Sequence, residues 1–336
     1  MSRRASRRRH VGPLEVGRRR RRIGPFFVTL LVLAIPFAIA AGVYGYVVRD
    51  DGAGAAADPL DKARAPEAGG GSLEPRSPAP IRLDGGDAVN VRFSKPPRAA
   101  LLFDVDNGRV LFRRSPERVL PIASLTKIMT ALAVAEETKP DEKVKITRDA
   151  LKYQGSGVGV LPKGKSVALN AMMSGLLLVS GNDAAIALAD HVSGTQKRFV
   201  ALMNEKARLW GLRCTHYVSP HGLEKGNRSC AADLAVLARL AMRNPRITSI
   251  VRRKEAEFRF PIKGGKLYLY GHNPLIRAGY PGAIGLKTGF TEDAGRCFVG
   301  IARRHGKMLG VVLLNSSNPM KHAETLLDRG FAADRG

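Results

Sequence analysis

Residues 121–137 read PIASLTKIMTALAVAEE, and this stretch combines a helix signal with a pair of residues suited to catalysis. Apolar residues at positions 125, 128, 129 and 132 would lie on one face of a helix that we expect from Ser124 to about Glu137. Ser124 and Lys127 are three residues apart, so the same helix would bring both side chains to one face. The stretch therefore predicts an amphipathic helix that begins with a serine beside a lysine.

The sequence on both sides of this helix has the periodicity of further strands and helices. A hairpin is expected from strands at 99–105 and 109–113, joined by the turn residues 106–108. Further helices are expected at 168–179, 184–192, 196–209 and 231–243, and further strands at 257–262, 266–270, 283–288, 296–303 and 308–315. Strands at both ends of a helical block predict an α+β fold, with an antiparallel sheet flanked by helices.

The N-terminal region carries the signals of a membrane anchor. Residues 1–25 form a basic tail, and residues 26–48 follow without a single charged side chain. As a helix, this second segment would be roughly 35 Å long, enough to cross a bilayer. Arginines at 18–22 predict a cytoplasmic tail and place the rest of the chain outside the cell membrane, as a single-pass protein. The alternative is a cleaved signal peptide, for which residues 53–57 offer small side chains.

Residues 49–90 are rich in alanine, glycine and proline and have no apolar periodicity. They predict a flexible linker, followed by one folded domain at 91–336. The formal net charge is +26, but ten arginines against one glutamate lie in residues 1–25. The remaining basic residues are scattered among acidic ones without interleaved aromatic side chains. This pattern predicts no nucleic-acid partner.

Two more short strings can complete a site around Ser124. A serine hydroxyl needs an adjacent base, and burial would favour a neutral Lys127; the alternative is a surface pair on an amphipathic helix. The string Ser180-Gly-Asn182 interrupts two apolar helical runs, where it could relay a proton or only cap the second helix. The string Lys287-Thr-Gly289 ends a strand, where it could bind a carboxylate and let a substrate backbone lie close; the alternative is only an edge strand with a turn. In this order, the three strings predict one serine acyl-transfer site, whereas Ser316-Ser-Asn318 is a second S-x-N string in a different context.

The wider sequence resembles the low-molecular-mass D-alanyl-D-alanine carboxypeptidases, penicillin-binding proteins of serine peptidase family S11. The resemblance covers the chain from about Lys95 onward and is carried by four segments: Pro121–Lys127, Leu176–Ala184, Ser219–Leu223 and Gly285–Thr291. It implies a β-lactamase/transpeptidase-like fold with a helical subdomain. Ser219 departs from the pattern, because asparagine is more usual at that position.

The resemblance also implies roles for individual residues. Ser124 would be the acyl-enzyme nucleophile, Lys127 its proton acceptor and Ser180 the second active-site serine. The implied oxyanion hole consists of the backbone amides of Ser124 and Phe290. The residues expected to bind substrate are Asn182, Lys287, Thr288, Gly289 and Phe290.

On this resemblance, the chain is expected to be a membrane-anchored D-Ala-D-Ala carboxypeptidase that acts outside the cytoplasm. Its partners would be peptidoglycan stem peptides, β-lactam antibiotics as covalent inhibitors, and the cytoplasmic membrane. No metal and no organic cofactor are expected. The alternatives are a D,D-endopeptidase or β-lactamase using the same site, or a non-catalytic domain that binds cell wall or senses β-lactams.

The three cysteines are expected to differ in state. Cys214 and Cys230 bracket a loop-like stretch outside the cytoplasm, where disulfides persist, so they predict a bridge; the alternative is two separate buried thiols. Cys297 lies in an apolar strand and is expected to be a small buried hydrophobic residue. None of the cysteines has the spacing of metal ligands.

Overall fold

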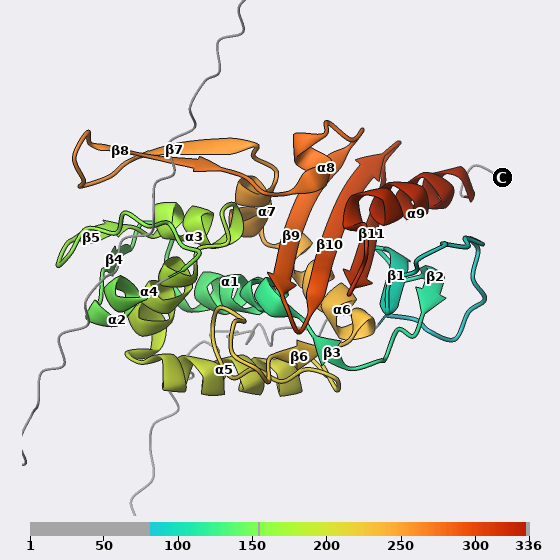
Figure 1. The fold of residues 1–336 in the computed structure, drawn as a ribbon, viewed down its shortest axis with the longest axis horizontal. Helices are drawn as coiled ribbons and strands as arrows, with labels where there is room; N and C mark the ends of the chain where they lie inside the picture. The colour runs from blue at the N-terminus through green and yellow to red at the C-terminus, as the bar shows by residue number, and fades with distance from the viewer. Residues whose placement is uncertain (1–80, 154, 334–336) are drawn as a thin grey trace, which may run out of the picture. The chain divides into compact units, whose positions relative to one another are not determined.

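One antiparallel sheet of five strands organises the domain (Figure 1). The computed structural model describes residues 81–153 and 155–333. The spatial order of the strands is β2 (Val110–Arg114), β1 (Ala99–Asp104), β11 (Lys307–Leu314), β10 (Gly295–Arg304) and β9 (Ala283–Thr291). Leu101 on β1 lies opposite Val312 on β11, so strands from the two ends of the domain pair with each other. This arrangement confirms the expected α+β fold.

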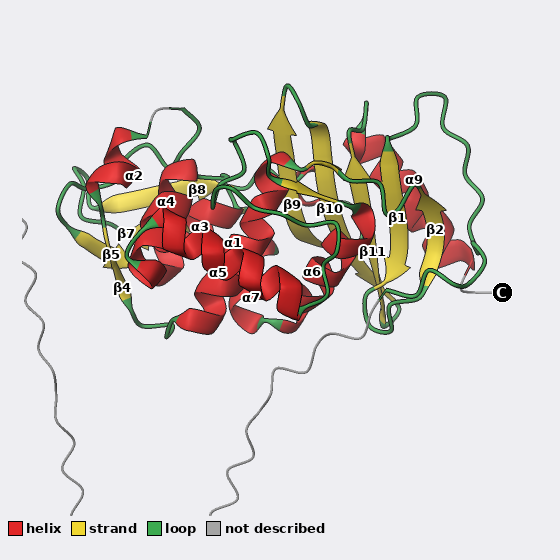
Figure 2. Ribbon diagram, turned by 90° about the horizontal axis from the view of Figure 1, so that it is seen from below, coloured by secondary structure: helices red, strands yellow, loops and turns green. Residues whose placement is uncertain are grey.

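Helices from the middle of the chain pack on one face of the sheet (Figure 2). Nine of the twelve residues of α1 (Thr126–Glu137) are buried, so this helix is enclosed on more than the one face expected. It is surrounded by helices of the helical block. The block consists of α2 (Arg148–Lys152), α3 (Leu169–Leu177), α4 (Asn182–Ser193), α5 (Gln196–Leu209), α6 (Ala231–Arg243) and α7 (Pro245–Val251).

The other face of the sheet is covered by α8 (Pro274–Arg277) and α9 (Pro319–Ala333). Leu101 belongs to the core on the side of the helical block, whereas Leu102 belongs to the core beneath α9. Both faces of β1 are therefore buried, which explains why its sequence is a continuous apolar run rather than an alternating one.

Three small two-stranded pairs complete the domain. They are β3 (Leu120–Pro121) with β6 (Arg228–Ser229), β4 (Lys143–Lys145) with β5 (Ser166–Ala168), and β7 (Glu255–Arg259) with β8 (Lys266–Tyr270). The first two pairs and the short helices α2, α7 and α8 were not expected from periodicity, because each spans too few residues to establish a period. Two of the missed helices still carry a start signal, since Asn244 and Asn273 each precede a proline and cap the helix that follows.

The folded domain begins earlier than the expected boundary at residue 91. The backbone amide of Val89 donates to Leu111 O at 2.9 Å, and Arg82 N donates to Gly108 O at 3.0 Å. Asp87 forms an ion pair with Arg113 at 2.7 Å. Residues 81–90 thus belong to the domain and not to the linker. They pack as an irregular segment along β2, and such a segment leaves no periodic signal in the sequence.

The N-terminal expectations concern residues that the structure does not describe. The basic tail at 1–25, the anchor at 26–48 and the linker up to residue 80 all lie outside the described residues. Within residues 81–153 and 155–333, no helix is both long and apolar enough to span a bilayer.

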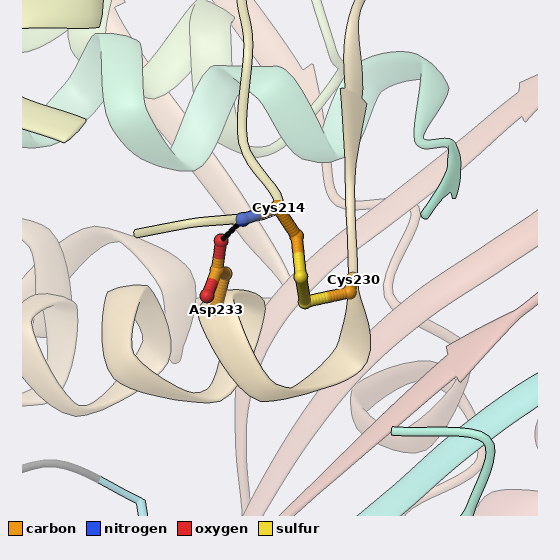
Figure 3. Close-up of side chains that lie close together, drawn as sticks. All are labelled: Cys214, Cys230 and Asp233. Atoms are coloured by element: carbon orange, nitrogen blue, oxygen red, sulfur yellow. Dashed lines mark hydrogen bonds between the residues drawn. A yellow bond between two sulfur atoms is a disulfide. The ribbon is translucent and has the colours of Figure 1, made fainter. Parts of the chain in front are cut away.

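Cys214 and Cys230 are joined by a disulfide that closes the base of the loop between them (Figure 3). The Asp233 carboxylate accepts a hydrogen bond from Cys214 N at 2.7 Å. These three side chains lie as close together as metal ligands would, but both sulfur atoms are already bonded to each other. Cys297 is a free thiol and is buried, in agreement with the sequence.

We expect the double substitution Cys214→Ala/Cys230→Ala to lower the free energy of unfolding by about 3 kcal/mol, because the bridge closes a loop with a sequence separation of 16 residues. Urea denaturation of the wild type and the variant measures this difference. Cys297→Ala is the control that removes a thiol without touching the bridge. Mass spectrometry of non-reduced peptides tests the pairing itself, and a link from either cysteine to Cys297 would contradict it.

Candidate active site

Ser124 lies at the junction between the sheet and the helical block. It occupies a short 3₁₀ turn, Ala123–Leu125, that leads directly into α1. The serine therefore precedes the α-helix instead of being its first residue. Its neighbour Ala123 has a φ of 48°, a left-handed conformation that residues with a side chain seldom adopt. Such local strain persists only where the surrounding structure holds it, and it is common at functional sites.

Lys127 is fully buried next to Ser124. Its Nζ lies 3.0 Å from Ser124 Oγ, 2.6 Å from Asn182 Oδ1 and 2.7 Å from His221 O. Burial lowers the pKa of Lys127 well below its ordinary value, and the positive charge of Lys287 lowers it further. The surface alternative for this pair is therefore wrong. A neutral amine held by two fixed acceptors can direct its lone pair at the serine hydroxyl.

Lys287 connects the K-T-G string to Ser180. Its Nζ donates to Ser180 Oγ at 2.9 Å and to Thr288 O at 2.8 Å. The residue lies inside β9 and is 2% exposed, not at a strand end as expected, because the strand continues to Thr291. Burial lowers the pKa of Lys287 to about 7. Ser180 itself has a φ of 62°, so it too is held in a left-handed conformation.

Asn182 is the first residue of α4, but it does not cap that helix. The cap position is Gly181, which makes no side-chain cap hydrogen bond. The Asn182 amide instead lies between Lys127 and Tyr153, donating to Tyr153 Oη at 2.7 Å. The capping alternative for Asn182 is therefore wrong. Tyr153 was not expected as part of the site, because no motif surrounds it in the sequence.

Gly289 brings β9 against the nucleophile. A Cβ atom at this position would lie 3.0 Å from Ile122 O and 3.1 Å from Ser124 N, too close for a larger residue without movement of the backbone. The glycine is thus required by the packing of the strand on the 3₁₀ turn, in addition to any role with substrate. Because β9 is the outermost strand of the sheet, its other edge is open for a peptide to pair with.

The loop between the two cysteines completes the site. Gly222, with a φ of 87°, passes so close to Ala123 O that any side chain there would collide with it. Ser219 Oγ accepts hydrogen bonds from Gly222 N at 3.1 Å and from Asn227 Nδ2 at 3.0 Å. The serine that departs from the usual asparagine therefore stabilises the turn of this loop. The His221 carbonyl was missed, since a backbone group carries no sequence signal.

A cavity of about 540 Å³ opens over Ser124. Its walls include Ser180, Asn182, Thr288 and Phe290 of the expected site. Of the described residues that line it, Arg296 is the only arginine, lysine or acidic residue. Among the described residues, no carboxylate pairs with Arg296, whose side chain contacts Ser317 O at 3.4 Å. The cavity thus offers an unneutralised positive charge to a ligand.

The second S-x-N string, residues 316–318, has a structural role. Asn318 Oδ1 accepts a hydrogen bond from Lys321 N at 3.2 Å in the first turn of α9, and Ser316 Oγ bonds to His322 Nδ1 at 2.8 Å. Asn318 and Pro319 repeat the asparagine-proline start of α7 and α8. This string therefore fixes the start of a helix and does not meet Lys127.

The sequence profile of the family described as D-alanyl-D-alanine carboxypeptidase matches residues 94–318. The chain is 37% identical over 246 residues to D-alanyl-D-alanine carboxypeptidase DacB2 of Mycobacterium tuberculosis, covering 70% of this chain and 83% of the relative. It is 34% identical over 244 residues to DacF of Bacillus subtilis, covering 70% of this chain and 62% of DacF, so it spans about three fifths of that protein. A D-alanyl-D-alanine endopeptidase of Pseudomonas aeruginosa is 32% identical over 250 residues, covering 70% and 80%. The chain therefore belongs to the D-alanyl-D-alanine carboxypeptidase family, serine peptidase family S11.

Solved structures agree with this assignment and with the expected transpeptidase-like fold. A D-alanyl-D-alanine carboxypeptidase from Mycobacterium tuberculosis matches with a TM-score of 0.68 and 35% identity, covering 74% of this chain and 96% of that one. A mutant of the Streptomyces K15 DD-transpeptidase matches with a TM-score of 0.68 and 30% identity, covering 72% and 100%.

Two buried lysines should titrate below all ordinary lysines. We expect Lys287 to titrate near pH 7 and Lys127 well below 10.5 in a ¹³C NMR titration, with the signals assigned by Lys287→Met and Lys127→Met. Between about pH 7 and 10.5 the unfolded chain binds the proton that folded Lys287 has lost, so the free energy of unfolding should rise with pH in this window. Lys287→Met should reduce that rise. Titration of both lysines near 10.5 would contradict the burial argument.

Proposed function

We propose that this domain is a serine D,D-carboxypeptidase, which removes the terminal D-alanine of peptidoglycan stem peptides through an acyl-enzyme on Ser124. The observation that carries the proposal is the contact of 3.0 Å between Ser124 Oγ and a buried Lys127 whose pKa is lowered. Membership of the family supports the same reaction. The complete set of buried, hydrogen-bonded groups argues against a non-catalytic binding or sensing domain.

In the acylation step, Ser124 Oγ attacks the carbonyl carbon of the D-Ala–D-Ala bond while Lys127 Nζ accepts the hydroxyl proton. The backbone amides of Ser124 and Phe290 would stabilise the negative charge on the carbonyl oxygen. Support for this hole is the close approach of β9 to Ser124 N at Gly289. The bond between the two alanines then breaks and leaves the acyl group on Ser124.

The leaving amine must receive a proton, and Ser180 is placed to deliver it. Its hydroxyl contacts Lys287 Nζ at 2.9 Å, and a lysine with a pKa near 7 can replace the proton that the serine gives up. Before deacylation, Lys127 must release the proton it accepted and Lys287 must regain the one it gave up, by exchange with solvent. Neutral Lys127 then takes a proton from the water that attacks the acyl carbonyl and passes it to Ser124 Oγ as the acyl bond breaks. Asn182 would hold both Lys127 and an amide of the substrate.

The substrate is proposed to lie along the open edge of β9, with its free terminal carboxylate near Lys287, Thr288 and Arg296, which has no carboxylate partner among the described residues. A permanent positive charge in the cavity suits a chain end more than an internal bond, and this favours a carboxypeptidase. Because some relatives are named endopeptidases, D,D-endopeptidase activity on the same site is the second candidate. β-Lactam antibiotics, which also carry a carboxylate beside a reactive carbonyl, would acylate Ser124.

We place the enzyme at the outer side of the cytoplasmic membrane, held by residues 26–48 as a single-pass anchor. The uncharged run and the arginines before it support this topology. The disulfide between Cys214 and Cys230 is consistent with an oxidising location.

Ser124→Ala should abolish both the release of D-alanine from a pentapeptide and covalent labelling by a fluorescent penicillin, because no acyl-enzyme can form. Ser317→Ala is the matched control, since this serine belongs to the second S-x-N string and is exposed; it should retain both activities. Penicillin labelling that survives in the Ser124→Ala protein would refute the assignment of the nucleophile.

Arg296→Gln should reduce kcat/KM for a peptide with a free C-terminal carboxylate by roughly tenfold to a hundredfold, the usual range for a lost charge-assisted contact. The same substitution should change turnover of the C-terminally amidated peptide much less. Arg303→Gln, at the far end of the same strand, is the control. An equal loss of kcat/KM for both peptides would show that Arg296 does not bind the carboxylate.

A further inference from the structure

The loop closed by the disulfide contacts Lys127 and the residue that precedes Ser124. At its tip, His221 O accepts a hydrogen bond from Lys127 Nζ at 2.7 Å, and Pro220 O accepts one from Thr130 Oγ1 on α1 at 2.6 Å. Gly222 lies directly against Ala123 O, the residue before the nucleophile. The tip of this loop is therefore part of the wall that holds Ser124 and Lys127 in place.

The C-terminal arm of the loop supports the segment that leads to Ser124. Strand β6 pairs with β3 through Leu120 opposite Ser229 and Pro121 opposite Arg228. Strand β3 ends three residues before the nucleophile, and β6 ends directly before Cys230. The segment that ends at Cys230 is thus paired with the segment that leads to Ser124.

The disulfide ties this arm to the other arm of the loop. Just inside the bridge, His216 and Arg228 exchange backbone hydrogen bonds of 2.9 and 3.0 Å, so the arms run together from the bridge toward the tip. Cys214 is partly exposed, whereas Cys230 is fully buried. A soluble dithiol can therefore approach the bond from the side of Cys214. Once the bond is broken, Tyr217 still anchors the first arm in the core, but the two arms are joined next to the former bridge by hydrogen bonds alone, such as those between His216 and Arg228.

A small shift at the tip has a direct chemical consequence. When Lys127 is neutral, its two N–H groups are held by Asn182 Oδ1 and His221 O, and its lone pair is left for the proton of Ser124. If His221 O moves away, one N–H loses its acceptor and the amine is free to turn. Displacements of about 1 Å in such an arrangement can cost up to a hundredfold in rate.

We propose that the Cys214–Cys230 disulfide and the loop that it closes are positioning elements for the catalytic base, so that the acylation rate of Ser124 depends on the redox state of the bridge. The enzyme would reach full activity only after the bridge has formed outside the cytoplasm. The inference rests on the proposed function, since acylation is what the bridge controls. The bridge acts through His221 O and the β3–β6 pair, not by contact with substrate.

The test compares oxidised and reduced protein. A dithiol such as dithiothreitol passes two electrons and two protons to the bridge, which breaks the S–S bond and gives two thiols and an oxidised, cyclic reagent. We expect the second-order rate constant for labelling by a fluorescent penicillin to fall about tenfold on reduction. The double variant Cys214→Ala/Cys230→Ala should show the low rate with or without the dithiol. Cys297→Ala should behave as wild type in both states.

The pH profile separates positioning from general destabilisation. Loss of the His221 acceptor disfavours the charged form of Lys127, so the rising limb of the acylation rate should move to lower pH while its plateau falls. Partial unfolding would lower the maximal acylation rate without shifting the pH at which the rate rises. An unchanged rate after reduction, or a lower rate with an unmoved limb in protein that is still folded by circular dichroism, would overturn the proposal.

A second variant keeps the test open if the reduced protein does not fold. Ser219→Ala removes the acceptor for Gly222 N and Asn227 Nδ2 at the tip but leaves the bridge intact. It should lower the acylation rate and move the pH limb in the same direction; no effect on either would count against the inference. Failure of oxidised wild type to react with penicillin would instead overturn the proposed function.

Discussion

The burial of Lys127 is the constraint on which the rest of the site depends. Its side chain is fully buried, and among the described residues the hydrogen-bond partners of its Nζ are three neutral groups, Ser124 Oγ, Asn182 Oδ1 and His221 O. Neutral acceptors compensate a buried charge poorly, so the amine form is favoured and can act as a base. The partners come from distant parts of the chain, since Asn182 is 55 residues away and His221 is 94 residues away. The helical block and the loop between the cysteines are thus both needed to create one base.

Several features that suit the site to catalysis lower the free energy of unfolding of the protein. Two lysines are buried next to each other, and two non-glycine residues of the site, Ala123 and Ser180, have left-handed backbone conformations. Each feature is unfavourable by itself and persists because the surrounding structure enforces it. For Ala123, the enforcing contacts are those of Gly289 on β9 and of Gly222 in the loop, both of which pack closely on the 3₁₀ turn. The disulfide at the base of that loop belongs to the same scaffold.

The sheet supplies the substrate side of the site. Strand β9 packs on Ser124 through Gly289, while its outer edge has no partner strand in the sheet. A peptide that pairs with this edge would present its carbonyl to the nucleophile and its chain end to the positive side of the cavity. The position of β9 at the edge follows from the strand order. Strand β1 pairs with β11 on the side opposite to β10, so no strand is added next to β9. The catalytic strand is therefore left outermost by the topology.

The sequence by itself determined the local features: the expected helices and strands, the three strings that meet at Ser124, and the identity of the cysteines that pair. Hydrophobic period and residue chemistry are short-range properties, so they can be read without the fold. Only the tertiary structure decided that Lys127 and Lys287 are buried, that the His221 carbonyl and Tyr153 join the site, and that residues 81–90 belong to the domain. It also showed that the two asparagines of the S-x-N strings differ in role, because Asn182 accepts a hydrogen bond from Lys127 whereas Asn318 caps a helix. The same residue types occur in both strings, and the difference lies in which distant groups the chain brings next to them.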